Sequence, residues 1–162
     1  DRRVIFTYRG WLKFKKYLIS KNLIKYKIPD SVINIKRSEW TFKENSNGYG
    51  KIGVDGAIKI SLKNMENLAE YLNENNTDLS IAVYPWPAQL KYDKVNNKQV
   101  KIWKQFCEDK CKLFFDFMPY FFNDLKENSF KKVYRKYFIL DDVHFNYEGN
   151  KLLVEGFIEK YH

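Results

Sequence analysis

The stretch Leu79-Ser80-Ile81-Ala82-Val83-Tyr84, which Pro85-Trp86-Pro87 ends, decides the fold class of this 162-residue chain. Its first six residues are mostly apolar strand formers, and proline cannot continue a central strand. A predicted amphipathic helix precedes the stretch, with apolar residues at helical spacing. These residues are Ile58, Leu62, Met65, Ala69 and Leu72. A continuous apolar strand after a helix is typical of a buried parallel sheet.

The order of helix and strand repeats along the rest of the chain. We expect a helix over residues 100–107, a strand over 113–117 that Pro119 stops, a short helix over 120–126 and a closing helix that contains Leu152, Leu153 and Phe157. Strands that alternate with helices form parallel sheets, because each helix carries the chain back to the start of the next strand. The sequence therefore predicts one α/β domain over residues 1–162.

The N-terminal region has apolar and basic residues at helical spacing. The apolar set is Val4, Tyr8, Trp11, Leu12, Leu18 and Ile19, and the basic set is Lys13, Lys15 and Lys16. This pattern predicts a basic amphipathic helix, which either lies on a membrane surface or packs its aromatic stripe on the protein core. We favour core packing. Residues 27–56 break the pattern with Pro29 and four glycines, and they predict a long loop.

The amino-acid composition is that of a folded protein, but it does not identify a binding partner. Hydrophobic residues make up 44% of it, enough to bury a core, so a disordered tail is excluded. It holds 29 Lys and Arg against 20 Asp and Glu, a net charge of +9. Only five of the 29 are Arg, the residue type best suited to phosphate recognition. We therefore expect a solvated, lysine-rich surface and no nucleic-acid partner. No apolar window is long enough for a transmembrane segment.

The two cysteines, Cys107 and Cys111, are four residues apart. Neither histidine lies near them in the sequence, so the usual four-ligand zinc site is excluded, and we expect no metal and no cofactor. A disulfide inside one helical turn needs distorted geometry. We therefore expect two reduced, partly buried thiols.

The strongest candidate for chemistry is Asp141-Asp142-Val143-His144-Phe145-Asn146-Tyr147-Glu148-Gly149, in front of the closing helix. An imidazole and a carboxylate two or three positions apart can meet across one tight turn, where the carboxylate orients the ring and stabilises its protonated form. Such a pair is what the base for a nucleophilic hydroxyl requires. A helix cap beside an incidental histidine explains the same spacing equally well.

Two motifs resemble one enzyme family. The block Asp141-Asp142-Val143-His144-Phe145-Asn146-Tyr147-Glu148-Gly149-Asn150-Lys151-Leu152 resembles the C-terminal block of SGNH/GDSL hydrolases. The segment Ile81-Ala82-Val83-Tyr84-Pro85-Trp86-Pro87-Ala88-Gln89-Leu90 is similar to the late strand of an envelope-associated branch of that family. The arrangement before it, Trp40 followed by a Gly-rich turn and a helix, is similar too. The resemblance covers roughly residues 40–158.

The resemblance implies a flavodoxin-like three-layer α/β/α fold with a parallel sheet, lacking its first strands here. It also implies ester hydrolysis or acyl transfer by a serine nucleophile, with His144 as general base and Asp141 or Asp142 as its orienting carboxylate. The implied substrate is an acylated, for example acetylated, glycan or a similar ester, and the implied location is the cell envelope or periplasm. The residues that would bind the substrate are Trp40, Tyr84, Trp86 and Gln89.

The chain also departs from the family pattern. The family's nucleophile lies in a Gly-Asp-Ser block after the first strand, and no Gly-Asp-Ser occurs here. We therefore expect the C-terminal part of an SGNH-like domain, with little activity alone because the serine and the oxyanion donors lie elsewhere. Two alternatives stay open: a glycan-binding relative without catalysis, and a non-enzymatic basic module that binds polyanions. The module would use Lys13, Lys15, Lys16, Lys131, Lys132 and Arg135.

Overall fold

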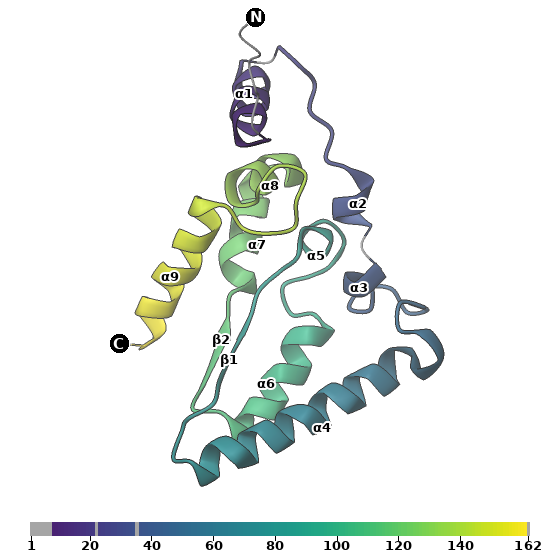
Figure 1. The fold of residues 1–162 in the computed structure, drawn as a ribbon, viewed down its shortest axis with the longest axis vertical. Helices are drawn as coiled ribbons and strands as arrows, with labels where there is room; N and C mark the ends of the chain where they lie inside the picture. Colours follow the sequence, from purple (N-terminus) through teal and green to yellow (C-terminus); the bar gives the residue numbers. More distant parts are fainter. Residues whose placement is uncertain (1–7, 22, 35, 162) are drawn as a thin grey trace, which may run out of the picture.

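The apolar run that follows residue 78 forms a strand of a parallel sheet in the computed structural model, which describes residues 8–21, 23–34 and 36–161 (Figure 1). Strand β1 (Ser80–Val83) pairs with β2 (Leu113–Asp116), with Ser80 opposite Leu113 and Val83 opposite Asp116. Within the described residues the sheet has these two strands alone, and most of those residues are helical. The expected parallel pairing and the mixed α/β class are confirmed.

Three of the four helices around the sheet follow the predicted order, and the short helix α5 was not predicted. α4 (Gly53–Glu74) precedes β1, and α5 (Pro87–Tyr92) and α6 (Lys98–Lys110) carry the chain from β1 to β2. α7 (Met118–Glu127) follows β2, and Pro119 lies in its first turn, where the missing N–H of proline costs nothing. A small core joins α4 and α6 to the strands through Ala69, Phe106 and Cys107.

The largest core lies at the carboxyl end of the sheet, where α8 (Phe130–Tyr137) and α9 (Tyr147–Tyr161) complete the chain (Figure 1). Its most buried large side chains are Tyr134, Phe121 and Phe138. The sequence analysis did not predict α8, although its apolar residues have helical spacing. These residues are Phe130, Val133, Tyr134 and Tyr137.

The predicted long loop over residues 27–56 is only partly correct. It contains two short helices, α2 (Asp30–Ile33) and α3 (Lys36–Glu39), and the turn η1 (Gly50–Ile52). Gly53 and Gly56 belong to α4, so the helix begins before the glycine-rich segment ends. Gly53 has a φ of 64°, a conformation that glycine adopts at no steric cost, and this residue turns the chain from η1 into α4.

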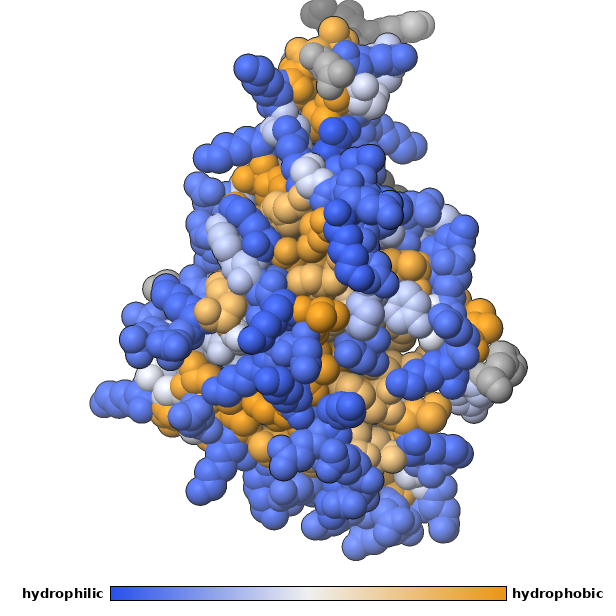
Figure 2. All heavy atoms as spheres, turned by 180° about the vertical axis from the view of Figure 1, so that it is seen from behind, coloured by the Kyte–Doolittle hydropathy of each residue, from blue (hydrophilic) through white to orange (hydrophobic). Residues whose placement is uncertain are grey.

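The N-terminal helix α1 (Tyr8–Ser20) forms as predicted, but its apolar stripe packs on the core only in part. Of the predicted apolar set, Ile19 is buried, whereas Trp11 is 50% exposed. Tyr17, which the prediction did not include, is 55% exposed. Val4, which the prediction included, lies outside the described residues. The helix lies at one end of the molecule beyond α8 (Figure 1), and apolar side chains show between hydrophilic ones at that end (Figure 2). The expectation of core packing is therefore wrong for Trp11.

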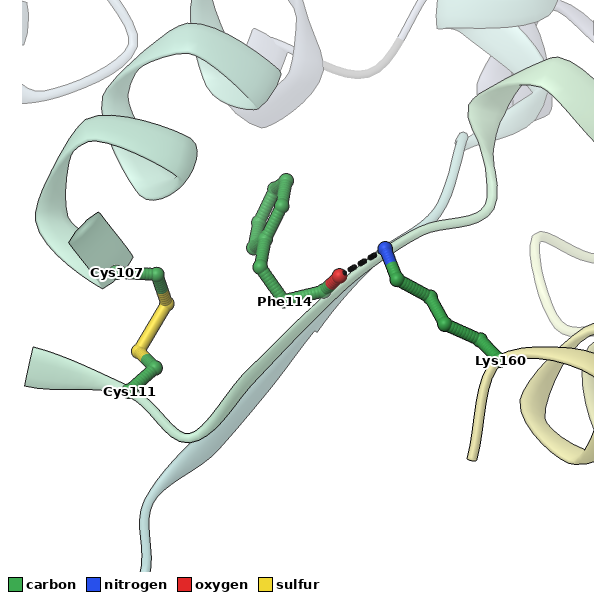
Figure 3. The surroundings of a disulfide bond; sticks show 4 residues. All are labelled: Cys107, Cys111, Phe114 and Lys160. Atoms are coloured by element: carbon green, nitrogen blue, oxygen red, sulfur yellow. Dashed lines mark hydrogen bonds between the residues drawn. A yellow bond between two sulfur atoms is a disulfide. The ribbon is translucent and has the colours of Figure 1, made fainter. Parts of the chain in front are cut away.

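The expectation of two reduced thiols is also wrong, because Cys107 and Cys111 form a disulfide (Figure 3). α6 ends at Lys110, and Cys111 follows with an extended backbone of φ −120° and ψ 148°. The second cysteine therefore lies just beyond the helix rather than inside its last turn. The two Cα atoms are 4.5 Å apart, within the usual range for a disulfide, and the bond ties α6 to the start of β2.

Among the described residues no helix combines the length and the apolar composition that crossing a membrane requires.

Candidate active site

The segment that contains His144 is a closed turn between α8 and α9. Phe138 and Phe145 form an antiparallel bridge, and the Ile139 N–H donates to the His144 carbonyl oxygen at 2.9 Å. The Asn146 N–H donates to the Tyr137 carbonyl oxygen at 2.9 Å. These bonds join the two ends of the turn, so residues 139–145 form a loop of defined shape rather than an open connection.

Tyr134, fully buried on α8, supports this loop from the protein interior. Its hydroxyl lies 2.9 Å from the Ile139 carbonyl oxygen and 2.8 Å from that of Asp142, so one proton serves two acceptors. The same oxygen accepts the Asp142 N–H at 3.0 Å. Burial raises the pKa of this phenol, so it stays protonated at neutral pH. Tyr134 therefore determines where the backbone of Asp142 lies.

His144 and Asp142 form the pair that the sequence pattern suggested. The His144 Nδ1 lies 2.8 Å from the Asp142 Oδ1, and the same oxygen accepts the N–H of Val143 at 2.6 Å. Because an ionised carboxylate only accepts hydrogen bonds, Nδ1 carries a proton and donates it to Asp142, and Nε2 takes no part in this bond. The His144 side chain is 78% exposed. The ring is thus oriented from one side and open to a reactant on the other.

The hydrogen bonds act on the acidity of Asp142. Partial burial by itself raises the pKa of this carboxyl. The hydrogen bonds from the His144 ring and from the N–H groups of Val143 and His144 outweigh burial, and the pKa lies below its usual value. Asp142 is therefore a stable anion at neutral pH, as the orienting partner of an imidazole must be.

Asp141 is placed differently and does not meet the imidazole. Its carboxylate forms an ion pair with Lys15 of α1. Its backbone has a φ of 63°, in the left-handed region, which turns the chain between Asp141 and Asp142. Of the two carboxylates that the sequence left open, the structure brings Asp142 to His144 and directs Asp141 to α1.

Tyr84 lies beside this pair. It follows β1 directly, and its ring packs edge-on against Phe145 with centroids 5.5 Å apart. Tyr84 is 43% exposed. Because the strands are parallel, Tyr84 and Asp116 mark the same carboxyl edge of the sheet. The His144 loop therefore lies at the edge where α/β proteins usually hold their ligands.

The other three predicted substrate-binding residues form a second group. Trp40, Trp86 and Gln89 line a pocket of about 270 Å³ together with Ser38, Tyr49 and Gln99, and neither Tyr84 nor His144 lines it. Gln89 is buried and fully engaged: its amide oxygen accepts the Trp86 N–H at 2.9 Å, and its amide nitrogen donates to Gln99 at 2.8 Å. Gln89 thus holds the start of α5 and has little left to offer a ligand.

Two residues that the sequence analysis did not single out hold the loop. Tyr134 is one, and its sequence position offered no signal beyond helical spacing. Asn146 is the other: its amide oxygen accepts the Gly149 N–H at 3.1 Å, and its amide nitrogen donates to the carbonyl oxygens of Lys136 and Phe138 at 3.0 Å each. An asparagine three residues before a helical glycine is a recognisable N-cap, so this role could have been predicted.

No known protein family, curated protein or solved structure matches this chain.

Proposed function

We propose that this chain carries the His-Asp half of an SGNH-type ester hydrolase or O-acyltransferase, whose serine nucleophile lies outside residues 1–162. The observation that carries the proposal is the 2.8 Å contact between His144 Nδ1 and Asp142 Oδ1, with the imidazole exposed at the carboxyl edge of a parallel sheet. If this segment served only as a helix cap, it would not need an exposed imidazole whose second nitrogen is free.

The reaction would use this pair as a proton relay. His144 Nε2 takes the proton of the serine hydroxyl as its oxygen attacks the ester carbonyl, and Asp142 stabilises the imidazolium that forms. The tetrahedral intermediate collapses when His144 returns the proton to the departing alcohol, which leaves an acyl-serine. Water or an acceptor hydroxyl then attacks the acyl group, with His144 again removing and returning one proton. Hydrolysis and acyl transfer differ only in this last acceptor.

We also propose a fold for the whole domain. A sheet of only two four-residue strands is rarely stable without further strands or helices that cover it. A flavodoxin-like three-layer α/β/α sheet would add strands from the part that carries the serine. β1 and β2 with their helices are the portion of such a sheet that this chain supplies.

The substrate we propose is an acylated glycan or a similar ester, in the cell envelope or periplasm. The exposed Tyr84 ring beside His144 offers an apolar face on which a sugar ring can stack. The Cys107–Cys111 disulfide supports the location, because disulfides persist in oxidising compartments and are rare in the cytosol.

The test is an assay of p-nitrophenyl acetate and acetylated-oligosaccharide hydrolysis by the chain expressed together with its upstream coding sequence. His144→Ala should lower kcat/KM by about 10³-fold or more, as removal of a catalytic base does. Glu148→Gln, an exposed charge four residues away, is the matched control and should leave the rate unchanged. Equal turnover in the wild type and His144→Ala would exclude the proposal. Sugar binding without turnover in the wild type would favour the glycan-binding relative instead.

A further inference from the structure

We propose that α1 and the adjoining face of α8 form a surface that binds an anionic lipid bilayer. The first observation is the direction of the aromatic side chains of α1. Trp11, Phe14 and Tyr17 recur every three residues, and all are exposed, Phe14 to 44%. At 100° per residue, Phe14 and Tyr17 lie on the side of the helix opposite Ile19, the residue that is buried against the protein. The aromatic face of α1 therefore points away from the core.

The second observation is the charge around this face. Neither α1 nor α8 contains an acidic residue. Lys136 of α8 is exposed but pairs with Asp124 of α7. Among the side chains that the structure describes, the other exposed basic residues of the two helices are Lys13, Lys16, Lys131, Lys132 and Arg135. Within the part of the chain that the structure describes, none of these five is joined to a carboxylate by an ion pair, so their charges are available to a partner.

Contacts through Tyr26 join the two helices into one surface. The Lys15 ammonium of α1 lies 5.5 Å from the centre of the Tyr26 ring, and the Lys131 ammonium of α8 lies 6.0 Å from the same ring. Lys15 also forms the ion pair with Asp141, in the loop that follows α8. The basic residues of α1 and α8 are therefore neighbours in space, although more than one hundred residues separate them in the sequence.

A surface of exposed aromatic side chains flanked by lysines suits the headgroup region of an anionic bilayer better than it suits a nucleic acid. Trp, Tyr and Phe rings settle between headgroups and acyl chains, while lysine stems reach up to the phosphates. A nucleic acid would take its contacts from the charges and would not need an apolar helix face turned outward. Both features occur at the same end of the molecule, where α1 lies beyond α8 (Figure 1).

The test is co-sedimentation of the 162-residue chain with vesicles made of equal parts phosphatidylcholine and phosphatidylglycerol, and with pure phosphatidylcholine vesicles. We expect binding to the anionic vesicles at low salt, a steep loss of binding as salt rises, and little binding to the neutral vesicles. Trp11→Ala with Phe14→Ala, and separately Lys131→Glu with Lys132→Glu, should each reduce the partition coefficient at least about tenfold.

The matched control variants replace side chains of the same kinds on other helices. Tyr71→Ala on α4, an aromatic residue 63% exposed, and Lys101→Glu with Lys104→Glu on α6 should leave vesicle binding unchanged. Circular dichroism of each variant verifies that it folds. Absence of binding to anionic vesicles would overturn the proposal. So would DNA binding that the lysine pair abolishes and the aromatic pair leaves intact, because that result identifies a nucleic-acid surface.

Discussion

The hydroxyl of Tyr134 lies 2.8 Å from the carbonyl oxygen of Asp142 and accepts the N–H of the same residue at 3.0 Å. One buried phenol thus holds both backbone polar groups of the residue whose carboxylate orients His144. The relationship links the hydrophobic core to the candidate site, because a change in the packing of α8 would move Asp142 directly. Tyr134 is a positioning residue and does not itself contact the imidazole.

Tyr134→Phe should destabilise the protein by about 1–3 kcal/mol, because the carbonyl oxygens of Ile139 and Asp142 lose the buried hydroxyl that donates to them, although the Asp142 N–H still donates to the Ile139 carbonyl oxygen. Urea denaturation measures this loss. Tyr120→Phe is the matched control, since its hydroxyl bonds to Glu159 on the surface at 2.9 Å and should contribute much less. Equal effects of the two substitutions would show that the Tyr134 hydroxyl does not support the loop.

The depressed pKa of Asp142 predicts a specific pH dependence of stability. Because this pKa lies below its usual value of 3.8 in the folded state, the ionised carboxylate stabilises the fold above that pH. The contribution is lost as the pH falls through the folded-state pKa. The difference in unfolding free energy between the wild type and Asp142→Asn should therefore be largest above pH 3.8 and shrink below it. A difference that grows on acidification would contradict the assignment.

Gly149 is predicted to tolerate no side chain. A Cβ atom there would meet the Tyr137 carbonyl oxygen and would lie 2.8 Å from the Phe145 Cδ1. Gly149→Ala should cost about 1–3 kcal/mol and displace Phe145, the neighbour of His144. Thermal denaturation measures the cost, and Asn150→Ala on the exposed side of α9 is the control. A fully stable Gly149→Ala protein would mean that this helix packs differently.

The disulfide predicts that the protein, denatured without reductant, has no titratable thiols, and that both cysteines react once it is reduced. Cys107→Ser with Cys111→Ser should lower the unfolding free energy by about 2 kcal/mol, the value expected for so short a closed loop. Free thiols in the protein isolated from its native compartment would contradict the disulfide and, with it, the support for an oxidising location.

Much of the fold could be predicted from the sequence, for reasons that individual elements make plain. β1 and β2 are short apolar runs, and a proline follows each of them. Because these local features mark where each strand lies, the positions of both strands could be predicted. α8 has the spacing of a helix in only eight residues and lies between stronger signals. The disulfide depended on where α6 ends, and helix ends are the least certain part of a pattern.

The candidate site could be predicted in kind but not in detail. The spacing of His144 from two carboxylates allowed either to pair with it, and the left-handed backbone at Asp141 decides for Asp142. Amphipathic spacing in α1 showed which face is apolar but not what covers it. The packing role of Gln89 depends on Gln99, which only the folded chain brings near.

The most direct test of the central claim is the rate at which a fluorophosphonate probe labels a serine in the chain expressed with its upstream coding sequence. The probe reacts with serines that a neighbouring base activates. We predict labelling of one serine outside residues 1–162, slowed at least about 10²-fold by His144→Ala and by Asp142→Asn, but not by Glu148→Gln. Labelling that both substitutions leave unchanged, or no labelled serine in the wild type, would contradict the role of the Asp142–His144 pair.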